Sequence, residues 1–284
     1  MKQTYKTLYS LAGAALAICI TNSASAISTN YWSGAGDGTT WSSPANWQGG
    51  AVPVAGNTWQ IYLGTGFPTT TPAPITIGAA DVVQTADSMF GPEWGETLNV
   101  YGQVTTGFAF FPIGATTGPT STVNLYGNAV FNALDTFSVG DTWWFPGGPN
   151  VAVNVYDNSQ VTANWIQFGG HLSISGNGTV TANNGFNTGT ATGPVFTGGL
   201  DTDATRLIDI SGLGRLILPG DYTAQVNDWI TRGIIEGNGV AGAVSLDLVS
   251  DPGHTIVTAV PEPASMALLG LSGLALWLRR RLVS

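Results

Sequence analysis

Two pairs of carboxylates in this chain have a spacing that suits glycoside hydrolysis, which needs two carboxyl groups flanking the scissile bond. They are Glu93 and Glu96 in GPEWGET, and Asp201 and Asp203 in LDTDATR. Catalytic pairs usually come from different structural elements, and acids in glycine-rich loops are usually solvated. We therefore favour solvated loop acids and a non-enzyme, and keep a β-helical glycoside hydrolase as an alternative.

The histidine and cysteine residues give no support to other chemistries. His171 and His254 lie far apart, and neither has a serine or acid motif around it, so neither a catalytic triad nor a metal site is expected. The single cysteine, Cys19, lies in the N-terminal apolar segment. Removal of that segment leaves a body with no disulfide and no thiol nucleophile. We expect no cofactor and no metal.

The charge distribution excludes polyanionic partners. The formal net charge is -9, and the basic residues gather at the two ends of the chain. The body between them has no lysine and three arginines, Arg206, Arg215 and Arg232. Binding to nucleic acid depends on Lys and Arg that neutralise phosphates, so we expect no nucleic-acid partner.

A run of aromatic residues offers the best candidate for ligand contact. Trp143, Trp144 and Phe145 stand side by side in DTWWFPGGPN. Since alternate residues of a strand face opposite sides, at least one of the three must face solvent or a neighbouring loop. Carbohydrate contact at Trp143 and Trp144 is therefore a hypothesis.

Four more tryptophans lie near the start of the body, among glycine, serine, asparagine and proline turns. They could form a sugar-stacking face, but we favour a structural role in sealing the first edge of a stacked β-structure. Asp37 lies between two glycines, and we interpret it as a turn aspartate rather than a calcium ligand. The four tryptophans are Trp32, Trp41, Trp47 and Trp59.

The N-terminus has the three parts of a secretory signal. Lys2 and Lys6 precede an apolar run over residues 8–20, and small residues follow at Ala24 and Ala26. The pattern predicts a signal peptide over residues 1–26, cleaved after Ala26, with the Sec translocon as the export partner.

The middle of the chain repeats itself. VNVYDNSQVTAN from Val153 and LSISGNGTVTAN from Leu172 share apolar first and third places and a turn at the fifth and sixth. Looser copies begin at Leu98, Val123 and Ile208. The alternation predicts short half-buried strands, and stacked copies would bury a continuous core. The fold class predicted is all-β, with a parallel β-helix or β-solenoid body over residues 27–259; a β-sandwich or jelly roll is the alternative.

One segment, GDYTAQVNDWITRG, has helical periodicity instead. An apolar stripe is followed by a terminal glycine, which predicts a short amphipathic helix that covers the last coil. Asp221 is the expected cap; the stripe comprises Tyr222, Val226, Trp229 and Ile230, and Arg232 and Gly233 end the helix.

The C-terminus, residues 260–284, combines three features. Pro261 and Pro263 disfavour a helix and keep the strip around them, residues 260–265, extended. Residues 264–278 carry no charge and predict a single membrane-spanning helix of about 22 Å, shorter than a hydrocarbon core of about 30 Å. Arginines follow it, which places that end in the cytoplasm and the body outside.

These residues resemble the PEP-CTERM sorting signal of exported proteins of Gram-negative, biofilm-forming bacteria. The resemblance implies an exosortase, an integral-membrane protease or transpeptidase, as the processing partner. It implies transient anchoring in the inner membrane, followed by transfer of the body to the cell envelope, outer surface or extracellular matrix. The recognised strip would be Val260, Pro261, Glu262, Pro263, Ala264 and Ser265, with Arg279, Arg280 and Arg281 as the cytoplasmic basic cluster. The body also resembles the autotransporter-like solenoid regions of such proteins. We expect a structural protein associated with exopolysaccharide; a secreted carbohydrate-binding module is the first alternative.

Overall fold

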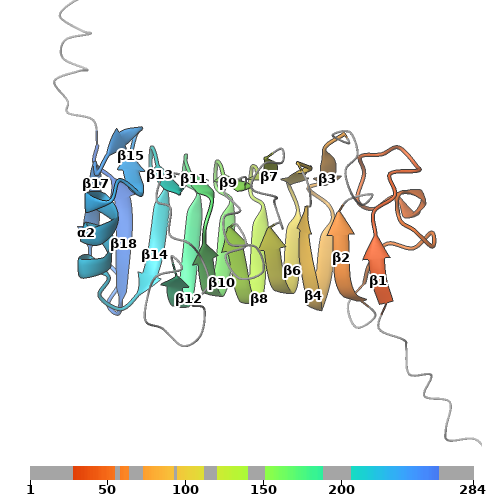
Figure 1. The fold of residues 1–284 in the computed structure, drawn as a ribbon, viewed down its shortest axis with the longest axis horizontal. Helices are drawn as coiled ribbons and strands as arrows, with labels where there is room; N and C mark the ends of the chain where they lie inside the picture. Colours follow the sequence, from red (N-terminus) through yellow and green to blue (C-terminus); the bar gives the residue numbers. More distant parts are fainter. Residues whose placement is uncertain are drawn as a thin grey trace, which may run out of the picture.

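The computed structural model describes residues 28–54, 58–63, 73–92, 95–111, 120–139, 151–187 and 206–261. These residues form two β-sheets whose strands follow one another along the long axis of the body (Figure 1). The N-terminal strands lie at one end and the C-terminal strands at the other. The prediction of an all-β body is therefore confirmed.

The larger sheet of the described residues has ten strands and the smaller has eight. In spatial order the larger comprises β1 (Ser28–Tyr31), β2 (Thr58–Leu63), β4 (Val82–Pro92), β6 (Gln103–Phe111), β8 (Val130–Val139), β10 (Gln160–Phe168), β12 (Thr179–Asn187), β14 (Arg215–Pro219), β18 (His254–Ala259) and β17 (Val244–Asp247). The smaller comprises β16 (Val240–Ala241), β15 (Ile235–Gly237), β13 (Leu207–Ile210), β11 (His171–Ile174), β9 (Val151–Val155), β7 (Ser121–Leu125), β5 (Thr97–Val100) and β3 (Ile75–Ile77).

From β3 to β15 the chain alternates between the two sheets. Each strand therefore pairs with the strand two places further along, and each of these pairs is parallel. A β-sandwich or jelly roll is built from antiparallel strands, so this pairing does not fit that alternative.

The five sequence copies occupy five neighbouring strands of the smaller sheet, β5, β7, β9, β11 and β13. Their first residues stand in register, so that Leu98 pairs with Val123, Val123 with Val153, Val153 with Leu172, and Leu172 with Ile208. The register predicted from the repeat is confirmed.

Alternating side chains build a core between the two sheets. In β7 and β9 every second residue is buried, and Val123, Leu125, Val153 and Val155 are each 0% exposed. Phe131 in β8 joins the same apolar cluster from the larger sheet. Each fully buried side chain of this size stabilises the fold by about 1.5–3 kcal/mol.

The C-terminal end departs from the parallel pattern. β18 lies antiparallel to β14 on one side and to β17 on the other, and β15 pairs antiparallel with β16. Asn238 and Gly239 form the two-residue loop between β15 and β16, with φ of 52° and 71°. Both residues need a positive φ in such a tight hairpin turn, and Asn-Gly is the pair best suited to it.

The predicted amphipathic helix is present as α2 (Thr223–Thr231). Val226 and Trp229 are 0% exposed in the core cluster, and the Trp229 ring lies 5.2 Å from that of Phe186 in β12. The expected cap was wrong by one residue: Tyr222, not Asp221, is the N-cap, and the helix begins at Thr223. Asp221 still accepts a hydrogen bond from the Thr223 N–H at 2.9 Å.

No helix of the described residues is long and apolar enough to cross a membrane. The predicted signal peptide and the predicted membrane helix both lie outside the described residues.

Candidate functional site

The predicted sorting motif begins where the last strand of the body ends. Val260 follows β18 directly, and its N–H donates to the carbonyl of Ala243 at 2.9 Å. Its carbonyl oxygen accepts a hydrogen bond from Nδ2 of Asn238 at 3.0 Å. Pro261, the next residue, is exposed. The body therefore holds the first residue of the motif through its backbone and leaves the second in solvent.

The other predicted site residues lie outside the described residues. They are Glu262, Pro263, Ala264 and Ser265 of the motif, Arg279, Arg280 and Arg281 of the basic cluster, Ala24 and Ala26 of the signal, and Trp143 and Trp144.

A stack of tyrosines on the smaller sheet was not singled out from the sequence. Tyr101, Tyr126 and Tyr156 each follow the last residue of β5, β7 or β9. Their ring centroids are 5.2 Å and 5.1 Å apart, with interplanar angles of 21° and 9°. The repeat spacing of adjacent strands, about 4.8 Å, produces this stacking because the residues stand in register. A tyrosine at the fourth place of three sequence copies was the available signal.

Small residues stand at both ends of this tyrosine stack. Gly78 follows β3 at the place before Tyr101, and Ser175 follows β11 at the place after Tyr156. The Ser175 N–H donates to the carbonyl of Val155 at 2.9 Å, so the hydrogen-bond ladder between the strands continues into the turn. Neither neighbouring rung therefore supplies a large side chain to cover the outer ring faces of the stack.

A ladder of asparagines runs beside the tyrosine stack. Asn124 Nδ2 donates to Asn99 Oδ1 at 2.9 Å, and Asn154 Nδ2 donates to Asn124 Oδ1 at 2.9 Å. Amide groups aligned in register can pair in this way on every rung. The outer face of these three strands thus presents aromatic rings next to amides, a combination that suits contact with sugars.

The central tyrosine has a perturbed pKa. Partial burial is the largest cause, and the charges that Tyr156, Tyr101 and Asp157 would carry add to it. Together they raise the pKa of Tyr126 above its ordinary value of 10.0. The hydroxyl therefore stays protonated at neutral pH and remains a hydrogen-bond donor.

Three of the four tryptophans near the start of the body have described side chains, and these three are buried, which confirms the sealing role for them. Trp32, Trp41 and Trp47 are 1%, 2% and 2% exposed. Trp47 packs edge to face against both others, with centroids 5.1 Å and 4.7 Å apart. Thr39 and Trp41 also exchange backbone hydrogen bonds with Thr76 in β3, so this segment covers the first strand of the smaller sheet.

Asp37 is a turn aspartate, as expected. Its Oδ1 accepts hydrogen bonds from the N–H groups of Thr39 and Thr40 and from Nδ2 of Asn46, at 2.7–2.9 Å. Hydrogen bonds with the Thr40 side chain and backbone, and then with Asn46 and Thr39, hold the pKa of Asp37 far below its ordinary value. The carboxylate is thus used in local structure.

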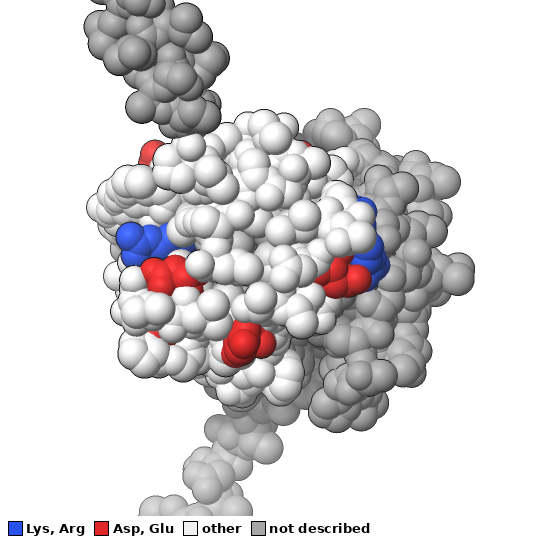
Figure 2. All heavy atoms as spheres, turned by 90° about the vertical axis from the view of Figure 1, so that its left-hand side faces the viewer, with Lys and Arg blue, Asp and Glu red and all other residues white. Residues whose placement is uncertain are grey.

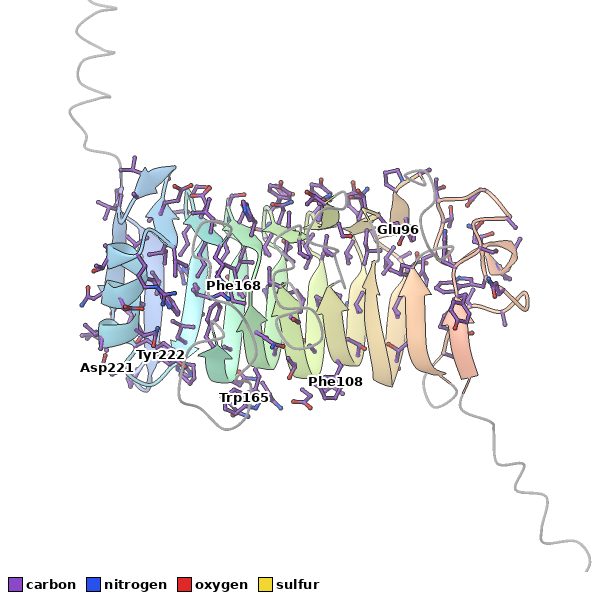
Figure 3. The ribbon with its side chains drawn as sticks, in the orientation of Figure 1. Glu96, Phe108, Trp165, Phe168, Asp221 and Tyr222 are labelled. Atoms are coloured by element: carbon purple, nitrogen blue, oxygen red, sulfur yellow. The ribbon has the colours of Figure 1, made fainter. Side chains whose placement is uncertain are left out.

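Of the four candidate catalytic acids, only Glu96 lies among the described residues. It precedes β5 (Figure 3) and is 5% exposed, so the interpretation as a solvated loop acid was wrong for this residue. The backbone carbonyl of Glu96 accepts a hydrogen bond from the Thr122 N–H at 2.8 Å, so Glu96 extends the pairing between β5 and β7 by one residue.

The two histidines are far apart in the fold. His171 begins β11 in the smaller sheet and His254 begins β18 in the larger. His254 Nδ1 lies 3.1 Å from Asp251 Oδ2, in a turn at the C-terminal end. No group of three metal-ligating side chains occurs in the described part of the chain.

One family model matches the chain. Residues 259–281 match the PEP-CTERM protein-sorting motif. The described body is thus β-rich, and the match to the sorting motif begins at Ala259, the last residue of β18. The motif indicates an exosortase-targeted surface protein, exported to the cell envelope, with exosortase as its processing partner. Among curated proteins and solved structures, nothing matches this chain.

Proposed function

We propose that this protein is a structural component of the cell surface or extracellular matrix that associates with exopolysaccharide and is processed at its C-terminus by an exosortase. The observation that carries the proposal is the match at residues 259–281, which starts at the last residue of β18. An N-terminal signal peptide and a C-terminal membrane helix would deliver the chain to the enzyme and hold it there transiently.

We further propose that the two sheets are the walls of one β-solenoid. The alternation of the chain between sheets and the shared register of the five copies support this architecture. A stack of this kind presents the same residue position again at every coil, so it forms long regular ladders. Such regularity suits a scaffold.

The tyrosine stack and its asparagine ladder support contact with a polysaccharide. A polymer of sugar rings repeats along its length, and so does this surface. The net charge of -9 favours a neutral polymer over a polyanion. Aromatic edges and outer faces would contact the apolar sides of sugar rings, and the amides would pair with hydroxyl groups.

Replacing all three stacked tyrosines by serine tests this contact. Serine already occupies the next rung at Ser175, so the backbone tolerates it there. Loss of these aromatic contacts should weaken retention on exopolysaccharide extracted from the producing bacterium about ten-fold, which corresponds to about 1.4 kcal/mol shared among the three rings. The control is Trp165→Ala, which removes an exposed aromatic of β10 in the larger sheet (Figure 3). Equal retention of the triple variant and the wild type would refute the contact.

The sorting function has a separate test. Glu262→Ala should leave the C-terminal tail attached in the membrane fraction, because the substitution removes the charged residue between the two prolines. Mass spectrometry of the protein recovered from the cell envelope would reveal both mature termini. Unchanged processing of this variant would refute recognition through the motif.

The two alternative functions, a carbohydrate-binding module and a glycoside hydrolase, can each be tested separately. If Trp143 and Trp144 form a carbohydrate-binding site, their replacement by alanine should abolish binding on a glycan array. If the body is a glycoside hydrolase, it should release reducing sugar from neutral glycans, and Glu93→Gln or Glu96→Gln should stop the release.

A further inference from the structure

Asn238 ties the C-terminal end of the stack together. Its backbone N–H donates to the carbonyl of Ile210 at 2.9 Å. Its side-chain Oδ1 accepts the N–H of Gly212 at 3.2 Å, and its Nδ2 donates to the carbonyl oxygen of Val260 at 3.0 Å. Because the Gly212 N–H can only donate, the amide orientation is fixed, and the NH₂ group must face Val260.

The contact falls on the first residue of the sorting motif. Val260 is also held by the carbonyl of Ala243, so both of its backbone hydrogen-bonding groups are engaged within the body. A protease or transpeptidase binds an extended peptide largely through backbone hydrogen bonds. The groups that such an enzyme would use at Val260 are therefore already occupied.

We propose that Asn238 is a clamp on the sorting motif, and that Val260 must leave Asn238 and Ala243 before the exosortase can take up the strip. The folded body thereby sets the rate of its own processing. The inference rests on the proposed processing by an exosortase and adds a residue of the body that controls it.

The clamp can open without unfolding the stack. Val260 is 43% exposed, and Pro261 beyond it is exposed as well, whereas Ala259 is 4% exposed and ends the pairing of β18 with β17. Backbone just beyond the end of a strand opens locally at a small fraction of the global unfolding free energy. The C-terminal end of the body, viewed in Figure 2, also shows only a few scattered charged side chains on its described surface. A membrane enzyme can thus approach it without burying many charges.

Two variants weaken the clamp while keeping the turn. Asn238→Asp keeps the acceptor for Gly212 and loses the donor to Val260. Asn238→Gly loses both side-chain bonds and keeps the positive φ of 52°. Loss of one hydrogen bond of ordinary net strength should raise the open population about five-fold. In pulse-chase labelling of the full-length chain in its host, both variants should be processed about five times faster, and the Val260 amide should exchange about five times faster in the purified full-length protein.

The matched control is Asp157→Gly. Asp157 also has a positive φ, 56°, and its Oδ2 accepts a glycine N–H, that of Gly127, at 2.8 Å. It lies far from Val260 in the stack, so its replacement should leave the processing rate unchanged.

The outcomes separate the clamp from the function it rests on. If Glu262→Ala is processed normally, the proposed exosortase processing fails. If Glu262→Ala blocks processing but the Asn238 variants are processed at the wild-type rate or more slowly, the clamp is wrong and the processing stands. Unchanged exchange at Val260 in Asn238→Asp would also overturn the clamp.

Discussion

The two ends of the stack are closed by different means. At the N-terminal end, a segment whose described helix is the three-residue 3-10 helix η1 (Pro44–Asn46) folds over β1 and β3 and inserts three indole rings into the core. At the C-terminal end, α2 lays Val226 and Trp229 over the core, and antiparallel strands extend both sheets. Both solutions protect strand edges and apolar surface, which repeat architectures must cover at their ends.

The two ends differ in how their backbone N–H and C=O groups find hydrogen-bond partners. At the C-terminal end the helix and the hairpin pair most of their own N–H and C=O groups, and Thr255 and Asn238 add a few side-chain bonds, so closure there depends mainly on apolar burial. The irregular N-terminal segment needs side chains for this purpose. Asn46, 0% exposed, accepts from the N–H groups of Gly36 and Gly38 and donates to Asp37 and the Thr40 carbonyl. The N-terminal end should therefore be sensitive to polar substitutions and the C-terminal end to apolar ones.

The largest expected effect is at the apolar end. Trp229→Ala should lower the free energy of unfolding by about 3–5 kcal/mol, because it empties a fully buried site against Phe186. Denaturant unfolding followed by circular dichroism measures the loss.

Trp229→Phe is the matched control for that prediction. The Trp229 Nε1 is buried and has no hydrogen-bond partner within the described residues, so a phenyl ring forfeits little besides volume. We expect a loss of about 1 kcal/mol. A similar cost for the two substitutions would contradict a closure based on apolar burial.

A smaller effect is expected at the polar end. Asn46→Ala should cost about 2–3 kcal/mol, because it leaves buried backbone groups of the cap without partners. The tryptophan emission of the N-terminal cluster should shift to the red as water reaches it, and denaturant unfolding measures the loss. Asn46→Asp, which keeps the acceptor but adds a charge beside Asp37, should be at least as damaging. A cost below about 0.5 kcal/mol for Asn46→Ala would show that the indoles alone close this end.

The repeated strands were predictable from the sequence, while the ends of the stack were less so. The five copies share both alternation and turn residues, so their register followed directly. The strands β3 and β15 extend the same sheet by one place at each end and were missed, since Ile75 and Ile235 begin segments too short to show the pattern. The antiparallel end also had a local signal, the Asn238-Gly239 dipeptide, which marks a hairpin.

The tyrosine stack and the contact between Asn238 and Val260 also differ in how far they could be predicted from the sequence. The tyrosine stack could have been found from the tyrosine shared by three copies, although the varied spacing between copies hides which coils are neighbours. The contact between Asn238 and Val260 spans 22 positions and crosses the antiparallel strands, so no local pattern marks it. The tail itself was identified from the order of its parts, and the match at residues 259–281 agrees with that order.

Acid should loosen the N-terminal end through Asp37. Its pKa is held far below its ordinary value of 3.8 by hydrogen bonds in the fold, so its contribution to stability is complete above that value. The contribution is lost as the pH falls from about 4 toward the folded-state pKa. Acid titration followed by tryptophan fluorescence should show this loss in the wild type and a weaker pH dependence in Asp37→Asn. Identical titration curves would assign acid sensitivity to other carboxylates.

The smallest effect should come from Asp221 at the C-terminal end. Hydrogen bonds with the side chain and backbone of Thr223 lower the pKa of Asp221, which is exposed at the start of α2 (Figure 3). Asn keeps the oxygen that accepts the Thr223 N–H, so Asp221→Asn should have nearly the wild-type melting temperature at pH 7. Below the ordinary pKa of 3.8 the wild type loses the contribution of the carboxylate, and the two melting temperatures should converge further. Because closure by the helix depends on Trp229 rather than on the hydrogen bond of Asp221, a large loss in Asp221→Asn at neutral pH would mean that polar contacts govern both ends of the stack.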